Sequence, residues 1–202
     1  MKQSDSFEIF DGSGAVMISA PHNVEHVRSG KIRFAEPQTG LLAIGLHKKL
    51  NVPVIVKTVN ENDDANFDEV SSYKDRLVKY LNAHKNIKLL IDLHQLAPER
   101  EMAVDIGIAD GINFVDDEFV SQIVYAFQKN GIDNVVTDFP FKGAGKNTVS
   151  SFVRARCDVQ TIQLELNTNL LVDEYPTYNF DGVFDALKSV IELYNSKEGN
   201  NE

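Results

Sequence analysis

Three ionisable side chains, His22, His94 and Glu165, each stand at the end of a run of β-type apolar residues. Such runs are typical of buried parallel strands. In open α/β sheets, ligands bind just beyond the carboxyl ends of the strands, so we expect these groups to meet at one edge of a sheet. Two histidines and a carboxylate at that edge can hold a metal ion and act on a bound water. The pattern therefore predicts an enzyme with a metal centre.

The ligands of this centre are expected to be histidines and carboxylates, because a catalytic zinc usually takes three such ligands and keeps one position for water. His22 and His94 are two candidates, since each lies where a strand meets a loop. The third ligand is open between two acids. Glu25 has the spacing His-x-x-Glu, which suits a tight turn, whereas Glu36 lies just before Pro37, where a helix is expected to begin. The helix dipole favours an acid there whatever its role, so placement alone does not choose between them.

Glu165 is the candidate catalytic residue. It ends the strand-like segment 161–165, and a carboxylate in a central strand is costly to bury unless it is paired or functional. Near a metal-bound water it would act as a general base and then pass the proton to the leaving amine. The alternative is a structural ion pair with a neighbouring cation such as Arg154 or Arg156.

Two further segments carry weaker chemical signals. Residues 141–148 are similar to a phosphate-binding loop, but the leading glycine is absent and Asn147 replaces the hydroxyl residue expected after the lysine. We therefore expect a flexible loop that borders the site. The charged run Glu99-Arg100-Glu101 is expected to be a solvated loop face, and a substrate role for Arg100 is the minor alternative.

A sheet and its helices must position these groups. Apolar runs and alternation predict strands at residues 7–10, 15–18, 52–56, 87–93, 102–109, 133–136 and 159–166. Helical periodicity predicts helices at residues 39–50, 68–84, 116–129, 150–156 and 181–194. The remaining segments are expected to be a hairpin turn at 11–14, a polar loop at 22–38, a solvated acidic turn at 61–64 and a frayed tail at 196–202. The alternation predicts one α/β domain over residues 1–202, a three-layer αβα arrangement with a mixed, mostly parallel sheet and helices on both faces.

Composition limits the partners of this domain. The net charge of −10 disfavours a nucleic acid or an anionic membrane as partner, because phosphates would be repelled. A small acidic substrate stays compatible, since one or two arginines in a cleft outweigh the global field at contact distance. The sequence has no transmembrane-length apolar stretch and no apolar signal core after the N-terminus. Its single cysteine, Cys157, fits a reducing compartment, and we expect a cytoplasmic protein.

Four short motifs resemble those of the N-formylglutamate amidohydrolase family, within the wider zinc carboxypeptidase and aspartoacylase superfamily. They are Ser19-Ala20-Pro21-His22, Glu36-Pro37-Gln38-Thr39-Gly40, Asp92-Leu93-His94 and Gln163-Leu164-Glu165-Leu166-Asn167. They span most of the chain in the superfamily's order: first histidine, acid, second histidine, late glutamate. The resemblance implies a zinc peptidase-like fold in which His22, Glu36 and His94 bind Zn²⁺ and Glu165 carries the proton. It favours Glu36 over Glu25, because the acidic ligand of these relatives stands at the start of the first crossover helix, often just before a Thr-Gly pair.

The resemblance also implies an arginine that grips the substrate carboxylate in a bidentate pairing, in the region preceding the catalytic glutamate. Arg154 and Arg156 fall in that region, and Arg154 is the preferred candidate. Arg28, in the loop after His22, is the second. The chain departs from typical formylglutamate hydrolases in having His94 where many show an Asn-Arg pair, and in being short.

The leading hypothesis is therefore a zinc amidohydrolase that acts on an acidic N-acylated amino acid or a small peptide. The nearest rival is a metallocarboxypeptidase or a peptidoglycan-peptide hydrolase with the same site. A rival of another class is a non-catalytic domain that binds a small acidic ligand on the same fold.

Overall fold

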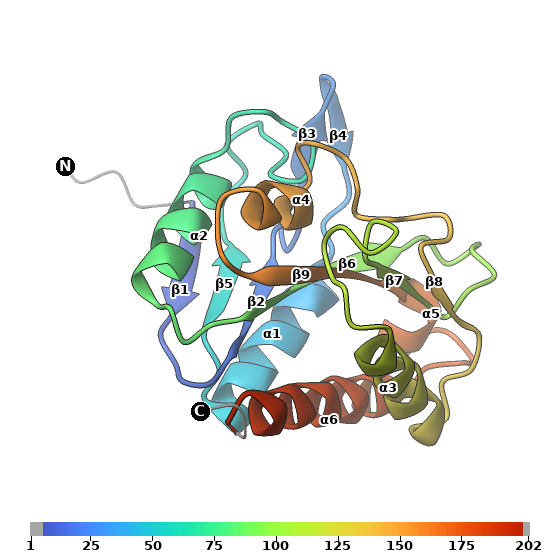
Figure 1. Ribbon diagram of the computed structural model, residues 1–202. Coiled ribbons are helices and arrows are strands. Elements are labelled where there is room, and N and C mark those ends of the chain that lie inside the picture. Colours follow the sequence, from blue (N-terminus) through green and yellow to red (C-terminus); the bar gives the residue numbers. More distant parts are fainter. Residues whose placement is uncertain (1–5, 200–202) are drawn as a thin grey trace.

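A seven-stranded sheet with the strand order β1-β5-β2-β6-β9-β7-β8 forms the centre of the computed structural model, which describes residues 6–199 (Figure 1). Its strands are β1 (Phe7–Phe10), β2 (Val16–Ala20), β5 (Val54–Lys57), β6 (Leu89–Leu96), β7 (Val104–Gly107), β8 (Val135–Thr137) and β9 (Gln160–Asn167). Strands β5, β2, β6 and β9 are parallel to one another, and β7 is parallel to β8. The pairs β1–β5 and β7–β9 are antiparallel, so the sheet is mixed and mostly parallel.

Helices cover both faces of this sheet (Figure 1). They are α1 (Pro37–Leu50), α2 (Ser72–Ala83), α3 (Asp117–Lys129), α4 (Val149–Arg154), α5 (Thr168–Leu171) and α6 (Phe180–Gly199). The larger hydrophobic core joins one face to α1, α3 and α6 through residues such as Leu46, Phe127 and Ile191. The smaller core joins the other face to α2 and α4, for example through Tyr73 and Val153. The predicted three-layer α/β fold is confirmed.

The predicted hairpin between the first two strands is wrong. Strand β5 lies between β1 and β2 in the sheet and pairs with both. The connecting segment packs against the end of α1, where the Ser13 N–H donates to the carbonyl of Asn51 at 2.7 Å. Gly12 is required at this contact, because a Cβ there would lie 2.2 Å from the same carbonyl oxygen. The turn residues are thus used for a close approach to a helix end.

Other differences concern the loops and the chain end. The predicted polar loop at 22–38 contains a two-stranded sheet of β3 (His26–Arg28) and β4 (Lys31–Arg33). Helix α6 continues through Gly199, so the predicted frayed tail is wrong over residues 196–199, and its last three residues lie outside the described part. Among residues 6–199, no helix combines the length and apolarity that crossing a bilayer requires.

Candidate active site

On one face of the sheet, the side chains of the central strands β6 and β9 change from apolar to polar along the strands. Side chains alternate between faces along a strand, and those facing α2 and α4 begin apolar, as at Leu90. Toward the carboxyl ends, the same face carries Asp92 and His94 on β6 and Gln163 and Glu165 on β9. The parallel register sets Asp92 beside Gln163 and His94 beside Glu165. Two adjacent strands therefore deliver a group of polar side chains to one edge of the sheet.

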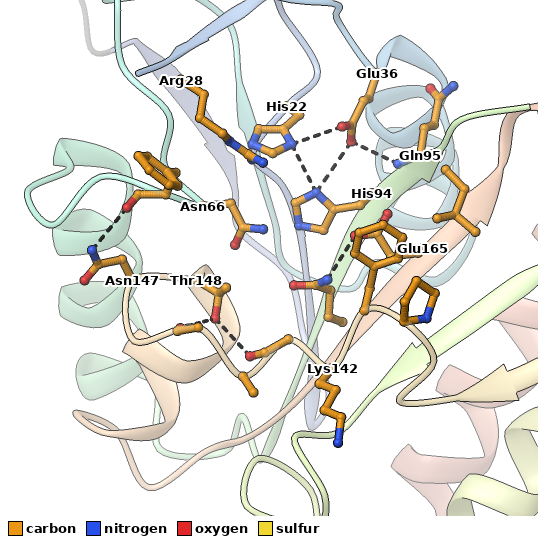
Figure 2. A pocket seen from close by; sticks show the side chains of 18 of the residues that line it. His22, Arg28, Glu36, Asn66, His94, Gln95, Lys142, Asn147, Thr148 and Glu165 are labelled. Carbon is orange, nitrogen blue, oxygen red and sulfur yellow. Dashed lines mark hydrogen bonds and ion pairs between the residues drawn. The ribbon is translucent and has the colours of Figure 1, made fainter. Parts of the chain in front are cut away.

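His22, Glu36 and His94 converge at this edge (Figure 2). The Nδ1 atoms of the two histidines lie 3.1 Å apart. One oxygen of Glu36 lies 3.1 Å from Nδ1 of His22, and the other lies 3.5 Å from Nδ1 of His94. Glu25 is exposed and lies outside this group. The structure thus places Glu36, and not Glu25, beside the two histidines.

Glu36 reaches this position because the backbone returns to His22 after the β3–β4 hairpin. The Glu36 N–H donates to the carbonyl of His22 at 2.8 Å, and α1 begins at the next residue, Pro37. Helix α1 lies very close to the loop after His22, since a Cβ at Gly40 would fall 1.9 Å from the side-chain oxygen of Asn23. Glycine at position 40 therefore lets the helix start, and Glu36 with it, approach the histidine.

A buried carboxylate lies behind each of the two histidines. Nε2 of His22 is 2.9 Å from Asp64, and Nε2 of His94 is 3.0 Å from Asp92. An ionised carboxylate only accepts hydrogen bonds, so in a neutral histidine Nε2 carries the hydrogen and Nδ1 presents a lone pair. Metal-binding histidines are commonly oriented in this way. Both rings therefore direct a lone pair at the point where the Glu36 carboxylate also converges.

This donor set fits a zinc ion. Tetrahedral zinc with bonds of about 2.0–2.1 Å brings its ligand atoms to about 3.3 Å from one another, close to the distances of 3.1, 3.1 and 3.5 Å between the converging atoms. Two lone pairs and a carboxylate also repel one another unless positive charge lies among them. The site thus requires a cation or protons.

Without a metal, the close approach of the three groups shifts their pKa values. Burial lowers the pKa of His22, but Glu36 and the hydrogen bonds to Asp64 and Glu36 outweigh it, so the pKa is raised. Burial likewise opposes the charge on His94, but Asp92 outweighs it and holds that pKa well above its ordinary value. Burial raises the pKa of Glu36, but the two histidines outweigh it and hold the pKa well below its usual range. The cluster therefore favours positive charge at its centre.

Asp64 is a residue of this site that the sequence pattern did not reveal. The prediction of a solvated acidic turn at 61–64 is wrong at Asp64, whose side chain is fully buried. One oxygen faces His22 and the other accepts a hydrogen bond from Nε of Arg28 at 2.6 Å. Burial raises the pKa of Asp64, but hydrogen bonds and charge from His22 and Arg28 outweigh it and hold the pKa well below its ordinary value.

Glu165 lines the same pocket as the three converging groups and is 9% exposed. Its carboxylate accepts a hydrogen bond from the side-chain amide of Gln163 at 2.9 Å. Burial raises the pKa of Glu165 to about 7 against the opposing charge of the histidines, and nearby carboxylates add to the rise. The alternative of an ion pair is not seen, because Arg154 and Arg156 donate to the carbonyls of Ile112 and Phe152.

The pocket around these groups has a volume of about 690 Å³. The predicted loop at 141–148 borders it as expected and faces the histidines across the cavity (Figure 2). Four cationic residues also line it: Arg28, Arg100, Lys142 and Lys146. Arg154 is not among the lining residues of the described chain, and Arg100, expected as a solvated loop residue, is exposed at the rim. Lys142 is paired with Asp110 at 2.7 Å and Lys146 lies 3.8 Å from Glu69, so the charge that favours an acidic ligand comes mainly from the two arginines.

A second group of possible ligands, His22, His26 and Asp64, lies next to the first. The His26 ring stacks on His22 with centroids 3.8 Å apart. The Arg28 guanidinium already neutralises Asp64 there, which opposes a second cation. We therefore assign this group to the support of His22.

Comparison with known proteins finds likeness of fold. No family model matches the chain, and no curated protein matches its sequence. A bacteriophage poly-γ-glutamate hydrolase has a TM-score of 0.64 at 14% identity, over 98% of this chain and 93% of that one. The zinc-free apo form of YNDL has a TM-score of 0.60 at 16% identity, over 96% and 91%. Succinylglutamate desuccinylase from Chromobacterium violaceum has a TM-score of 0.56 at 18% identity, over 92% and 67%. At such low identities the likeness shows the fold alone.

Proposed function

We propose that this protein is a zinc-dependent amidohydrolase. The main support is the convergence of Nδ1 of His22, Nδ1 of His94 and the carboxylate of Glu36, with Glu165 in the same pocket. Two histidines and one carboxylate form a ligand set of metal-dependent hydrolases, and a further carboxylate outside the set can serve as the base. The names of two structural neighbours, a hydrolase and a desuccinylase, agree with this reaction class.

In this proposal, the water and the carbonyl group are activated by zinc, and the proton is transferred by Glu165. A bound zinc ion would lower the pKa of a water molecule and polarise the scissile carbonyl. Glu165 accepts the proton that the water gives up as it attacks the carbonyl carbon, and then donates it to the leaving amine nitrogen. Burial raises the pKa of Glu165, and this makes its carboxylate a stronger base than a solvated glutamate. Gln163 holds the carboxylate through its amide.

The substrate class in this proposal is an acidic N-acylated amino acid or a small acidic peptide. Arg28 is the preferred partner of the substrate carboxylate, since it lines the pocket and its guanidinium lies on the same side as His22 (Figure 2). Arg100 adds positive charge at the pocket, whereas Asp110 offsets the charge of Lys142. Two of the structural neighbours carry glutamate in their names. The N-formylglutamate amidohydrolase resemblance leads to the same class of acidic substrate.

The test is an assay of zinc-loaded protein on N-formyl-, N-acetyl- and N-succinyl-glutamate beside short acidic peptides. Release of glutamate from an N-acyl compound, lost on removal of zinc and restored by its return, is the expected result. Cleavage of peptides alone would instead support the metallopeptidase alternative. Ligand-induced stabilisation without any turnover in zinc-loaded protein would contradict the enzyme and support a binding domain.

A further inference from the structure

The two carboxylate–histidine pairs behind the metal site are built differently. His94 is backed by Asp92, whose second oxygen is buried and has no hydrogen-bond partner in the described chain. His22 is backed by Asp64, whose second oxygen accepts the Nε–H of Arg28 at 2.6 Å. Only the His22 pair therefore continues to a cation that lines the pocket.

Arg28 faces two ways. Its Nε edge is bound to Asp64, and its guanidinium lies 5.5 Å from the centre of the Phe67 ring. The side chain is 35% exposed and lines the pocket. A guanidinium has five N–H donors in a rigid fork, so binding Asp64 through Nε leaves its terminal nitrogens for an anion. Arg28 thus combines a buried partner with a surface open to a ligand.

Asp64 is fixed in position between His22 and Arg28. Its carboxylate is fully buried and also accepts a hydrogen bond from the Asn66 N–H at 2.9 Å. Its own N–H donates to the side chain of Asp68 at 2.8 Å. The buried Asp64 carboxylate cannot turn to water. An anion that pairs with the Arg28 guanidinium therefore changes how far Arg28 offsets the negative charge that Asp64 directs at His22.

We propose that Asp64 is a positioning residue that couples the binding of an anionic ligand at Arg28 to the binding of the metal at His22. This inference rests on the proposed metal site and acidic substrate. With Arg28 unliganded, the guanidinium neutralises part of the charge of Asp64. An anion on Arg28 takes over part of that positive charge, so Asp64 supports the imidazole of His22 more strongly and the metal binds more tightly. By linkage, the metal then raises the affinity for the anion by the same factor.

The experiment measures zinc affinity with and without saturating glutarate, a dicarboxylate that contains no bond to hydrolyse. A chromophoric chelator buffers free zinc, and chloride replaces glutarate at matched ionic strength to remove screening effects. In the wild type, glutarate is expected to tighten zinc binding by about fivefold or more, the lower range of typical couplings. Asp64→Asn and Arg28→Gln should each reduce this factor to nearly one.

Asp92→Asn is the matched control, because it alters the carboxylate behind the other histidine. Both Asp64→Asn and Asp92→Asn should weaken zinc binding by about 10- to 100-fold, as loss of such a partner does. Only Asp92→Asn should keep the effect of glutarate. Direct binding of glutarate to the zinc would instead leave the effect intact in Asp64→Asn, and that result overturns the coupling.

Zinc affinity tests the coupling between Arg28 and His22, whereas turnover of acyl compounds tests the proposed function. If glutarate does not change the zinc affinity of the wild type, the coupling is overturned, whereas the proposal of amide hydrolysis is unaffected. Coupling without turnover of any acyl compound would support the inference and contradict the enzyme. If Asp64→Asn does not fold, a retained glutarate effect in Arg28→Gln overturns the coupling, because it excludes a path through Arg28.

Discussion

His94 on β6 and Glu165 on β9 are register partners in adjacent parallel strands, and both side chains lie on the sheet face that carries α2 and α4. The proposed ligand and the proposed base are therefore fixed to each other by the backbone hydrogen bonds of the central sheet. Sites built on strands hold their geometry more precisely than sites built on loops. The third proposed ligand, Glu36, is joined to the same strand, because one of its oxygens accepts the N–H of Gln95 at 2.9 Å.

Replacing Glu165 should separate catalysis from metal binding. Glu165→Gln keeps the shape and the partner Gln163 but cannot take a proton, so kcat should fall by about 10²- to 10⁴-fold, the usual contribution of a general base. The zinc content should stay unchanged, because Glu165 is outside the converging group. Turnover kinetics and metal analysis of the same preparation check both statements. Unchanged kcat would remove the assigned role.

The buried Glu165 should also make the metal-free protein sensitive to pH. Its pKa is raised from 4.5 to about 7 in the folded chain, so the folded state holds the proton more tightly than the unfolded state. Below about pH 4.5 the Glu165 carboxyl is protonated in both states, and its ionisation costs the folded state nothing. Above about pH 7 it is ionised in both states, and the free energy of unfolding is lower by on the order of 3 kcal/mol. Glu165→Gln should therefore gain stability relative to the wild type as the pH rises.

Urea unfolding of the metal-free wild type and Glu165→Gln at pH 5 and pH 8 measures this difference. Glu25→Gln is the matched control, because it makes the same substitution at an exposed position outside the pocket. A difference between wild type and Glu165→Gln that is the same at the two pH values would show that Glu165 titrates as an ordinary carboxylate.

The choice between the two acids after His22 can be tested through metal affinity. Glu36→Gln removes a carboxylate from the converging group and should weaken zinc binding by about 100-fold or more, beyond the effect of losing an outer partner. Glu25→Gln should leave it unchanged, because that side chain is exposed and outside the group. Zinc titrations of both variants give the comparison. The reverse order of effects would move the ligand to Glu25.

Substrate recognition should depend on Arg28 and not on Arg154. Arg28→Gln, assayed at saturating zinc, should raise KM for an N-acyl glutamate by about tenfold or more, as expected for a lost charge-assisted pairing. Arg154→Gln should leave KM and kcat near the wild-type values, because Arg154 lies outside the pocket lining and donates to the carbonyl of Ile112. Equal effects of the two variants would argue against this assignment.

The strand-borne part of the site was predictable from sequence because it depends on local alternation. In β6, Leu89, Ile91 and Leu93 face the larger core, so Asp92 and His94 must lie together on the opposite face. Alternation of this kind is visible along the chain and survives folding. The sequence signal was the apolar run that precedes each of His22, His94 and Glu165, and the structure brings these three groups into one pocket.

The remaining part depends on pairings between distant segments. Asp64 is buried because its loop packs on the β3–β4 hairpin, where the Val27 N–H donates to the carbonyl of Asp63 at 3.1 Å. Nothing in the acidic run 61–64 distinguishes the buried Asp64 from the half-buried Asp63 or the exposed Glu61. The expected β1–β2 hairpin was wrong for a similar reason, since β5 inserts between two strands that are adjacent in sequence. Arg154 was placed by its spacing from Glu165, which does not determine where its side chain points.

The central claim is that His22, Glu36 and His94 bind one zinc ion, and anomalous X-ray scattering at the zinc edge from crystals grown with zinc tests it most directly. We predict a single strong anomalous peak between Nδ1 of His22, Nδ1 of His94 and the carboxylate of Glu36. A peak at other residues, or no peak at this position in zinc-containing crystals, would contradict the claim.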